Sequence, residues 1–274
     1  MVDLHIHSTH SDGVYTPRKI IEECEKNKVE MFSITDHNNI DANYEVLQEL
    51  AREPRNIKYF TGSEVTCQID NKKDLHILCH NFDLLDDKLK GLVNDILHKQ
   101  NKQKEFLVRY LKDKIGIECS DMDFLSLDKI LLQIGKLVSD KKSQTEFKKT
   151  WREVRSQPIG ADFEQCAGIV HKAGGITSLA HPFVYQRHYK MDDKRFDSFI
   201  GTLAEQGLDA IEAFNPTHGM SKTTKYREIA RRHGLKMTAG SDFHSNGKKG
   251  RQIGTVSSCG VKVTPHEIYD LFNR

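Results

Sequence analysis

The chain opens with the stretch VDLHIHSTHSDG, residues 2–13, and this stretch decides how the rest of the sequence is read. Apolar and polar residues alternate along its first half, which predicts a β-strand with one apolar and one polar face. His5 and His7 therefore point the same way, about 7 Å apart along the strand, and such a pair can bind one metal ion. Asp12 follows in the next turn. Two histidines and an aspartate at the end of a first strand predict a metal site at the mouth of an α/β fold. A histidine tag is excluded as the explanation, because a tag would not alternate with apolar residues.

Length and composition are those of a globular protein. The 274 residues suffice for one α/β barrel or for two smaller domains. The 41 basic and 39 acidic residues nearly cancel, which does not identify a nucleic-acid binder and leaves room for a phosphate-bearing ligand in a local positive pocket. The six cysteines are scattered, which favours reduced thiols. The first 20 residues lack the apolar core of a signal peptide, and the sequence has no run of about 18 apolar residues, so we expect a cytoplasmic protein with no membrane association. No obligate protein partner is expected.

Strand-like and helical segments alternate in two parts of the chain, residues 1–82 and 159–274. In the first part, the predicted strands are residues 2–7, 29–35, 57–60 and 75–82. In the second part, they are residues 176–180, 208–214 and 235–239. Roughly seven strands alternating with helices indicate a parallel sheet with covered faces, either a barrel or an open doubly wound sheet.

Residues 83–158 interrupt this alternation with three helical stripes and no convincing strand. We interpret them as a helical insertion or cap domain within a discontinuous barrel made of residues 1–82 and 159–274. The tail of the insertion, residues 141–152, is basic. A solvated helix face explains this charge better than a lid that meets a polyanion.

The positions of the polar residues favour the barrel. Histidine and carboxylate residues follow or end several predicted strands, and the ends of strands on opposite flanks of an open sheet would be too far apart to share a site. In a closed barrel these ends converge on one mouth. The candidate metal ligands are His5, His7, Asp12, His37, Glu64, His76, His181, Asp242 and His244.

These nine donors are too many for one ion, which takes four to six donors including water and substrate. They suit two or three divalent ions. Imidazole and carboxylate without thiolate favour Zn²⁺, Mn²⁺ or Fe²⁺. Clustered ions of this kind serve the hydrolysis of phosphate esters, because they activate water and neutralise phosphate oxygens.

Six short motifs, in order, resemble the PHP (polymerase and histidinol phosphatase) family of metal-dependent phosphoesterases. They are His-x-His with Asp-Gly, Thr-Asp-His, Gly-Ser-Glu, His-Ile-Leu, Ala-His-Pro and Ser-Asp-Phe-His, spread over residues 1–82 and about 159–260. The resemblance implies a distorted (β/α)₇ TIM-like barrel with a trinuclear metal centre. The helical insertion is similar to that of the subgroup of nucleoside 3′,5′-bisphosphate phosphatases and 5′-to-3′ exoribonucleases.

The resemblance also implies a role for each ligand. The first ion would be held by His5, His7, Glu64 and Asp242. Glu64 would bridge to the second ion, which His76 and His181 complete. The third would be held by Asp12, His37 and His244. A metal-bridging hydroxide held by Glu64 and Asp242 would attack phosphorus in line.

Two departures from the family pattern concern the substrate. Val184 stands where related enzymes often have an arginine, and Arg187 or His188 could replace that arginine. His80 stands where tyrosine is common, and it shares a strand face with His76, so it could be the ligand instead; motif position favours His76. The candidate substrate contacts are Arg187, His188, His80, His218 and Arg251.

Two of these candidates have equally simple structural interpretations. His218 follows a predicted strand and is a candidate general acid, but a plain loop histidine fits as well. Arg251 could bind a phosphate through two nitrogens, although a surface arginine is the more common case.

The sequence therefore predicts a hydrolase acting on phosphoric ester bonds, with a nucleoside 3′,5′-bisphosphate or the 5′ end of a short RNA as substrate. One alternative is a histidinol-phosphate phosphatase, against which the helical insertion argues. Another is a non-catalytic, metal-stabilised PHP module, against which the nine intact ligand positions argue.

Overall fold

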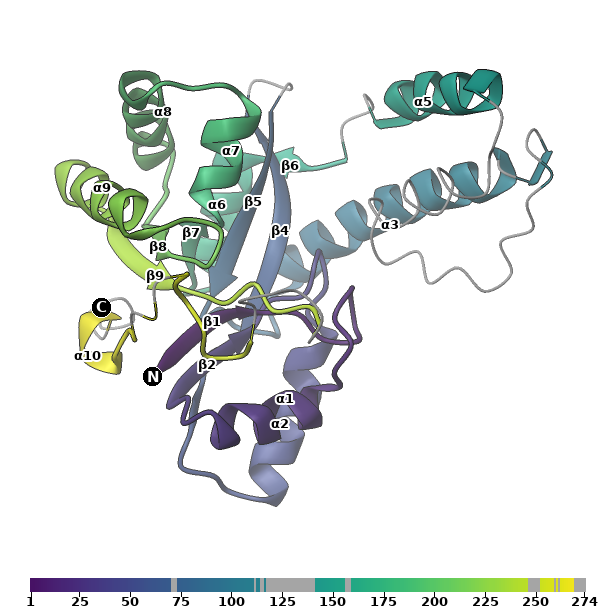
Figure 1. The fold of residues 1–274 in the computed structure, drawn as a ribbon. Coiled ribbons are helices and arrows are strands. Elements are labelled where there is room, and N and C mark those ends of the chain that lie inside the picture. Colours follow the sequence, from purple (N-terminus) through teal and green to yellow (C-terminus); the bar gives the residue numbers. More distant parts are fainter. Residues whose placement is uncertain are drawn as a thin grey trace. The chain divides into compact units, whose positions relative to one another are not determined.

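The structure is a computed structural model, and it describes residues 1–69, 73–110, 112–113, 116, 141–155, 159–245, 252–258, 260 and 262–268. The chain forms two compact units (Figure 1). The first consists of Met1–Val93 and Gly160–Arg274, and the second of Asn94–Ile159. Residues 83–93, which the sequence assigned to the insertion, belong to the first unit.

The first unit is an α/β fold with two sheets. One sheet has the strand order β1-β2-β3 and is parallel, and the other has the order β6-β4-β5-β7-β8-β9. The strands are β1 (Val2–Ile6), β2 (Met31–Ile34), β3 (Lys58–Tyr59), β4 (Gly62–Ile69), β5 (Lys73–His80), β6 (Ala161–Asp162), β7 (Ile176–Leu179), β8 (Ala210–Phe214) and β9 (Lys236–Ala239).

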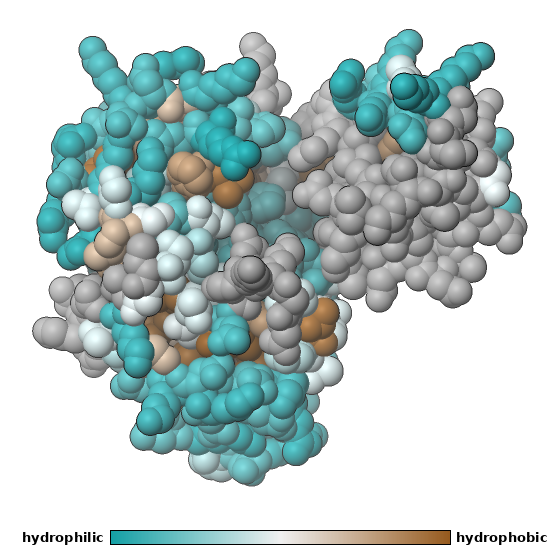
Figure 2. Space-filling model, in the orientation of Figure 1, coloured by the Kyte–Doolittle hydropathy of each residue, from teal (hydrophilic) through white to brown (hydrophobic). Residues whose placement is uncertain are grey.

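Amphipathic helices pack against these strands. Thr16 caps the first of them by accepting a hydrogen bond from the backbone N–H of Lys19, and Pro17 occupies the first turn, where its missing N–H costs nothing. In Figure 2 the surface over α8 and α9 is mainly hydrophilic, because the apolar side chains of these helices are buried. The helices of this unit are α1 (Pro17–Lys26), α2 (Asp41–Arg52), α6 (Phe163–Lys172), α7 (Pro182–His188), α8 (Asp193–Glu205), α9 (Met220–Arg232) and α10 (Pro265–Ile268).

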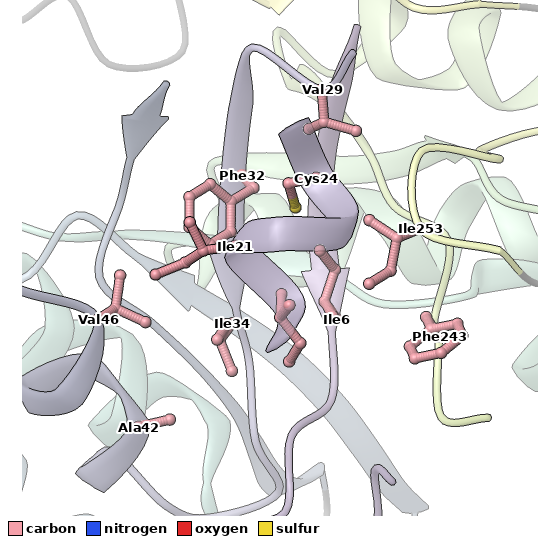
Figure 3. Close-up of a cluster of buried hydrophobic side chains, with 11 residues drawn as sticks. Ile6, Ile21, Cys24, Val29, Phe32, Ile34, Ala42, Val46, Phe243 and Ile253 are labelled. Carbon is pink, nitrogen blue, oxygen red and sulfur yellow. The ribbon is translucent and has the colours of Figure 1, made fainter. Parts of the chain in front are cut away.

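A hydrophobic cluster fixes the orientation of β1. Ile6 packs with Phe32 and Ile34 of β2, and α1 and α2 supply further members, including Ile21 and Val46 (Figure 3). Burying each such side chain contributes roughly 1.5–3 kcal/mol. Because Ile6 points into this cluster, alternation along the strand sends its neighbours His5 and His7 to the opposite side.

Backbone hydrogen bonds connect the two sheets at the ends of β1 and β2. Ile6 forms a parallel bridge with Phe243, just after β9, and His37, after β2, forms one with Glu64 of β4. The N–H of His7 donates to the carbonyl of Phe243 at 2.9 Å, and the N–H of Asn38 donates to the carbonyl of Glu64, also at 2.9 Å. These bridges place His7, His37, Glu64 and Phe243 at neighbouring positions.

The predicted parallel sheet was wrong for β5, which runs antiparallel to both β4 and β7, whereas the other strand pairs are parallel. The strand predicted at residues 57–60 is the two-residue β3, and a separate strand, β4, begins at Gly62. β4 and β5 are adjacent in the sequence and pair as a hairpin, with Glu64 opposite Leu78 and Thr66 opposite His76. The alternation had suggested that Glu64 and His76 lie toward or just after the C-terminal ends of strands. Instead, both residues lie within the first half of their strands.

The second unit contains the end of α3 (Asp87–Tyr110) and α5 (Lys141–Arg155). Phe147 of α5 is buried, and its ring lies 6.2 Å from that of Tyr110. Two of the three predicted helical stripes fall largely on α3, whereas the third, residues 127–137, lies outside the described residues. Among the helices described in either unit, none is both long enough and apolar enough to cross a membrane.

Candidate metal centre

The centre begins with the two histidines of the opening strand. His5 and His7 are fully buried, and their Nε2 atoms lie 3.1 Å apart. The turn after β1 is held by Asp36, which accepts hydrogen bonds from the N–H and the hydroxyl of Ser8 at 2.7 and 2.6 Å. The sequence thus converges two imidazoles and fixes the turn that carries Asp12.

The buried carboxylate of Glu64 is the centre of the cluster. Its Oε1 lies 3.0 Å from His76 Nδ1 and 3.0 Å from His181 Nε2. Its Oε2 faces three further imidazoles, at 3.4 Å from His5 Nε2, 3.3 Å from His7 Nε2 and 3.1 Å from His37 Nδ1. One side chain of β4 therefore contacts histidines from β1, β5 and the segments after β2 and β7.

Two aspartates flank this arrangement. Asp242 Oδ1 lies 3.6 Å from His5 Nε2, 3.5 Å from His7 Nε2 and 3.3 Å from His244 Nδ1. Asp12 Oδ2 lies 3.2 Å from His244 Nε2. Asp12 Oδ1 lies 3.7 Å from His37 Nε2 and 3.6 Å from His7 Nδ1. The structure thus links all nine predicted ligands through direct contacts.

Among the residues that the structure describes, three groups are compact enough to hold an ion, with ligand atoms within 4.8 Å of one another. They are His5, His7 and Glu64; His37, Glu64 and His76; and His7, Asp12, His37 and His244. His7, His37 and Glu64 each belong to two groups. Shared ligands of this kind suit neighbouring ions better than one isolated ion.

Backbone conformation also marks the site. Asn38, His181 and Asp242 have positive φ angles of 49°, 26° and 52°. Such conformations cost of order 1–3 kcal/mol in residues other than glycine and persist where the surroundings fix them. Strain at two ligands and beside a third indicates that packing, not local preference, sets the positions of these side chains.

Electrostatics favour ionised carboxylates here. Burial alone would raise the pKa of Glu64, but His37, His5 and His76 outweigh it and hold that pKa well below its usual value. Burial likewise opposes a charge on His7, yet Asp242 and Glu64 raise its pKa to about 10. Anionic oxygens therefore attract positive charge to this pocket, and metal cations can supply it in place of protons.

Buried carboxylate oxygens that accept no hydrogen bond indicate whether these residues are suited to metal ions. Within the described part of the chain, Glu64 Oε2 and Asp12 Oδ1 are buried and accept no hydrogen bond. A buried carboxylate oxygen without a donor is costly. Cations at these positions would remove the cost, so the donor set fits the metal ions that the sequence implied.

The structure brings together the predicted ligands, and the substrate-contact candidates that it describes are not members of these ligand groups. His80 is fully buried and its Nδ1 lies 3.3 Å from Ser33 Oγ, so the cluster contains His76 and not His80. Burial lowers the pKa of His80 to about 3. Arg187 and His188 are exposed at the end of α7. Arg251 lies outside the described residues.

His218 does not have the surroundings of a general acid. It is buried, and its Nε2 lies 3.0 Å from the carbonyl oxygen of Ala213, to which it can only donate. Burial lowers its pKa below the ordinary value. At neutral pH the ring is therefore uncharged and its Nε2 proton is already shared with the backbone, which favours a structural role.

Sequence reasoning missed Glu212, a fully buried carboxylate in β8. Its Oε1 lies 3.0 Å from His5 Nδ1, and its Oε2 accepts hydrogen bonds from the N–H of His181 and the side-chain amide of Asn215. The signal was present in the segment Ala-Ile-Glu-Ala-Phe, where one acidic residue interrupts an otherwise apolar buried strand. A buried acid in a core strand needs partners, and here the partners are two predicted ligands.

Comparison with known proteins shows a consistent set of similarities. The PHP domain family matches residues 3–157. The 3′,5′-nucleoside bisphosphate phosphatase of Chromobacterium violaceum is 25% identical over 265 residues, covering 92% of this chain and 90% of the relative. The 5′-3′ exoribonuclease Rnm of Escherichia coli is 24% identical over 252 residues, covering 88% and 84%. The phosphoribosyl 1,2-cyclic phosphate 1,2-diphosphodiesterase of Eggerthella lenta is 26% identical over 263 residues, covering 91% and 95%.

Solved structures show the same fold. A structure from Bifidobacterium adolescentis described as a metal-dependent phosphoesterase superimposes with a TM-score of 0.72 at 18% identity, covering 98% of this chain and 94% of that one. A Chromobacterium violaceum protein described as an amidohydrolase, with bound sulfate and no metal, gives a TM-score of 0.70 at 24% identity, covering 90% and 88%.

Proposed function

The chain belongs to the PHP domain family and is a hydrolase of phosphoric ester bonds, and we propose that its substrate is a nucleoside 3′,5′-bisphosphate or the 5′ end of a short RNA. The observation that carries the catalytic part of this proposal is the environment of Glu64. Its buried, ionised carboxylate is surrounded by five imidazoles, and one of its oxygens accepts no hydrogen bond from the described residues.

The relatives support the substrate class. A bisphosphate phosphatase, an exoribonuclease and a phosphoribosyl cyclic-phosphate diesterase are among the curated proteins that the chain resembles over most of its length. All three are named for the hydrolysis of phosphate esters, and two of the names refer to nucleosides or RNA. A histidinol phosphate substrate has no comparable support among these three relatives.

We propose that nine side chains hold two or three divalent ions, Mn²⁺, Zn²⁺ or Fe²⁺. Glu64 lies between the proposed first and second sites. The assignment is His5, His7, Glu64 and Asp242 for the first ion, Glu64, His76 and His181 for the second, and Asp12, His37 and His244 for the third. When bound, such ions supply Lewis-acid stabilisation of phosphate oxygens and a nucleophile at neutral pH.

The protein's own residues supply orientation and charge. The carboxylates of Glu64 and Asp242 face the same pair of imidazoles, those of His5 and His7, and so define where cations and the reacting phosphate can lie. Burial of these groups excludes water and strengthens their electrostatic interactions. The exposure of Arg187 and His188 and the burial of His80 leave the phosphate contacts unassigned among those three.

We also propose the finer architecture that the sequence suggested. The bridges Ile6–Phe243 and His37–Glu64 support closure of the two sheets into a distorted seven-stranded TIM-like barrel. In this proposal residues 1–82 and 159–274 form the barrel and residues 83–158 the inserted cap domain, whose first residues, 83–93, belong to the first compact unit. The family's common location of catalytic groups at one barrel mouth then explains why distant segments supply the ligands.

The test is a phosphate-release screen on purified protein whose metal content has been measured. Equal concentrations of nucleoside 3′,5′-bisphosphate, 5′-phosphorylated oligoribonucleotide and histidinol phosphate are compared with Mn²⁺, Zn²⁺ or Fe²⁺ added. We expect turnover of the first or second substrate. Preferential turnover of histidinol phosphate would replace the proposed substrate class. Absence of any turnover by the metal-loaded protein would favour a non-catalytic module.

A further inference from the structure

We propose that Glu212 is a positioning residue that couples the first and second proposed metal sites, because one carboxylate fixes a ligand of each. This inference rests on the metal sites assigned in the proposed function. It adds a residue that lies outside the nine ligands and contacts two of them.

The two oxygens of Glu212 have different tasks. Oε2 accepts a hydrogen bond from the backbone N–H of His181 at 2.6 Å and one from Asn215 Nδ2 at 2.8 Å. Oε1 lies 3.0 Å from His5 Nδ1. Since a carboxylate that receives these donors can only accept, His5 must carry a proton on Nδ1.

The contact with His5 determines which nitrogen faces the cluster. With Nδ1–H directed to Glu212, Nε2 points toward Glu64 and His7, at 3.4 and 3.1 Å. A carboxylate behind a histidine ligand fixes both the tautomer and the ring orientation, and its loss commonly weakens metal binding by about 10–100-fold. Glu212 therefore presents the Nε2 lone pair to the first site.

The contact with His181 controls a strained backbone. His181 has φ 26° and ψ 62°, and its Nε2 lies 3.0 Å from Glu64 Oε1. No side-chain hydrogen bond from His181 itself caps the helix that follows. The hydrogen bond from the N–H of His181 to Glu212 holds the residue in this conformation and directs its imidazole to the second site.

Neighbouring residues make space for this arrangement. A Cβ atom on Gly240 would lie 2.2 Å from His5 Cβ and 2.5 Å from Glu212 Oε1, so glycine is required for β9 to end beside them. Glu212 itself is the acidic residue of a strand whose other residues are apolar and buried. A fully buried carboxylate costs folding free energy unless its partners compensate, and a positional role explains its presence here.

The experiment compares Glu212→Gln with Asp209→Asn in the purified full-length chain. Asp209 lies beside the same strand and accepts hydrogen bonds from Thr177 and a contact from His171, away from the cluster. Zn²⁺ and Mn²⁺ affinities and the number of ions bound are measured by chelator competition. We expect E212Q to weaken metal binding at both the first and the second site by about 10–100-fold. D209N should leave both affinities within about twofold of the wild-type values.

A second variant separates positioning from a general loss of packing. In E212Q an NH₂ donor replaces one carboxylate oxygen, so it opposes either His5 Nδ1–H or the N–H of His181 and the amide of Asn215, all of which are donors. Adding Asn215→Asp provides an acceptor for the introduced NH₂ and leaves the amide oxygen for His5 Nδ1–H, so E212Q/N215D should recover several-fold affinity. If E212Q does not fold, Asn215→Ala alone should still weaken the same two sites, because it frees one side of the Glu212 carboxylate.

Histidine ¹⁵N spectra of the Zn²⁺-loaded protein supply a direct readout. The wild-type chain should show a slowly exchanging proton on His5 Nδ1, and E212Q should alter it. Unchanged zinc affinity together with an unchanged His5 signal in a folded E212Q or N215A protein overturns the proposal. A wild-type chain that binds metal normally but hydrolyses no phosphate ester overturns the proposed function instead and leaves the coupling measurable.

Discussion

His5 and His80 are both fully buried histidines on strands of the first unit, yet their surroundings impose opposite behaviour. His5 lies between Glu64, Glu212 and Asp242, and although burial opposes its charge, these carboxylates raise its pKa well above the ordinary value. His80 lies beside Ser33, and burial lowers its pKa to about 3. The same side chain is therefore a candidate metal ligand in one place and a neutral core residue in the other.

The comparison shows that carboxylate contacts, and not burial or strand position, define the centre. His76 and His80 lie on the same strand four residues apart, but His76 contacts Glu64. A metal ion competes with protons for imidazole nitrogen, and it does so best where anionic oxygens favour positive charge. The predictions that follow neutralise Glu64, remove the metal, replace His80, and replace two exposed residues outside the centre.

The largest expected effect comes from Glu64→Gln. Neutralising this carboxylate removes the charge that faces five histidines, so we expect loss of bound metal and a decrease of at least about 100-fold in kcat/KM. Elemental analysis and phosphate release measure the two quantities. Glu45→Gln, at an exposed carboxylate that contacts His10, is the control. An E64Q protein with full metal content would contradict the assigned role.

Metal removal should have the next largest effect. At a free Mn²⁺ concentration about 100 times its Kd, binding to the folded state adds about 2.7 kcal/mol to the free energy of unfolding. For a chain of this size we expect Tm to rise by roughly 5–10 °C over the chelator-treated protein. Differential scanning calorimetry with and without chelator measures this, and E64Q should show little of the increase. An equal increase in the Tm of the wild-type and E64Q proteins would show that the ion binds away from Glu64.

Local signals in the sequence predicted part of the centre, whereas features that depend on pairing between distant strands were not predicted. Alternation in the opening strand and short motifs after other strands were enough to predict His5, His7 and the PHP family, because these signals are local. Glu64 and His76 were predicted as ligands, but their places in the sheet were not, since the β4–β5 hairpin depends on pairing between strands. Sequence periodicity shows which residues share a face and does not show strand direction.

Glu212 illustrates a second limit. Its role depends on contacts with residues 31 and 207 positions away in the sequence, His181 and His5. A single sequence records the unusual acid in an apolar strand but not the partners that satisfy it. Arg187 shows a related limit: proximity to a motif along a helix does not determine which way a side chain points, and here the side chain is exposed at the end of α7.

A third prediction concerns His80 and pH. Its pKa of about 3 in the folded protein lies below the ordinary value of 6.5, so the unfolded chain binds more protons between these values. Stability is unaffected by this group above about pH 6.5 and decreases as the pH falls toward 3, by at most about 1.4 kcal/mol per pH unit. His80→Asn, which can keep a polar contact near Ser33, should flatten this dependence. Urea unfolding at pH 7, 6 and 5 measures it, and parallel pH curves for both proteins would refute the neutral-core interpretation.

The smallest expected effect comes from Arg187→Ala and His188→Ala. Both side chains are exposed at the end of α7, so stability should change by less than about 0.5 kcal/mol. Without a contact to the cluster, neither should change kcat/KM by more than about threefold. Steady-state kinetics on the preferred substrate tests this directly, with Arg195→Ala on α8 as a matched exposed control. A tenfold rise in KM in R187A alone would instead restore the sequence-based assignment of Arg187 to phosphate binding, and it would show that the substrate draws this exposed side chain into the site.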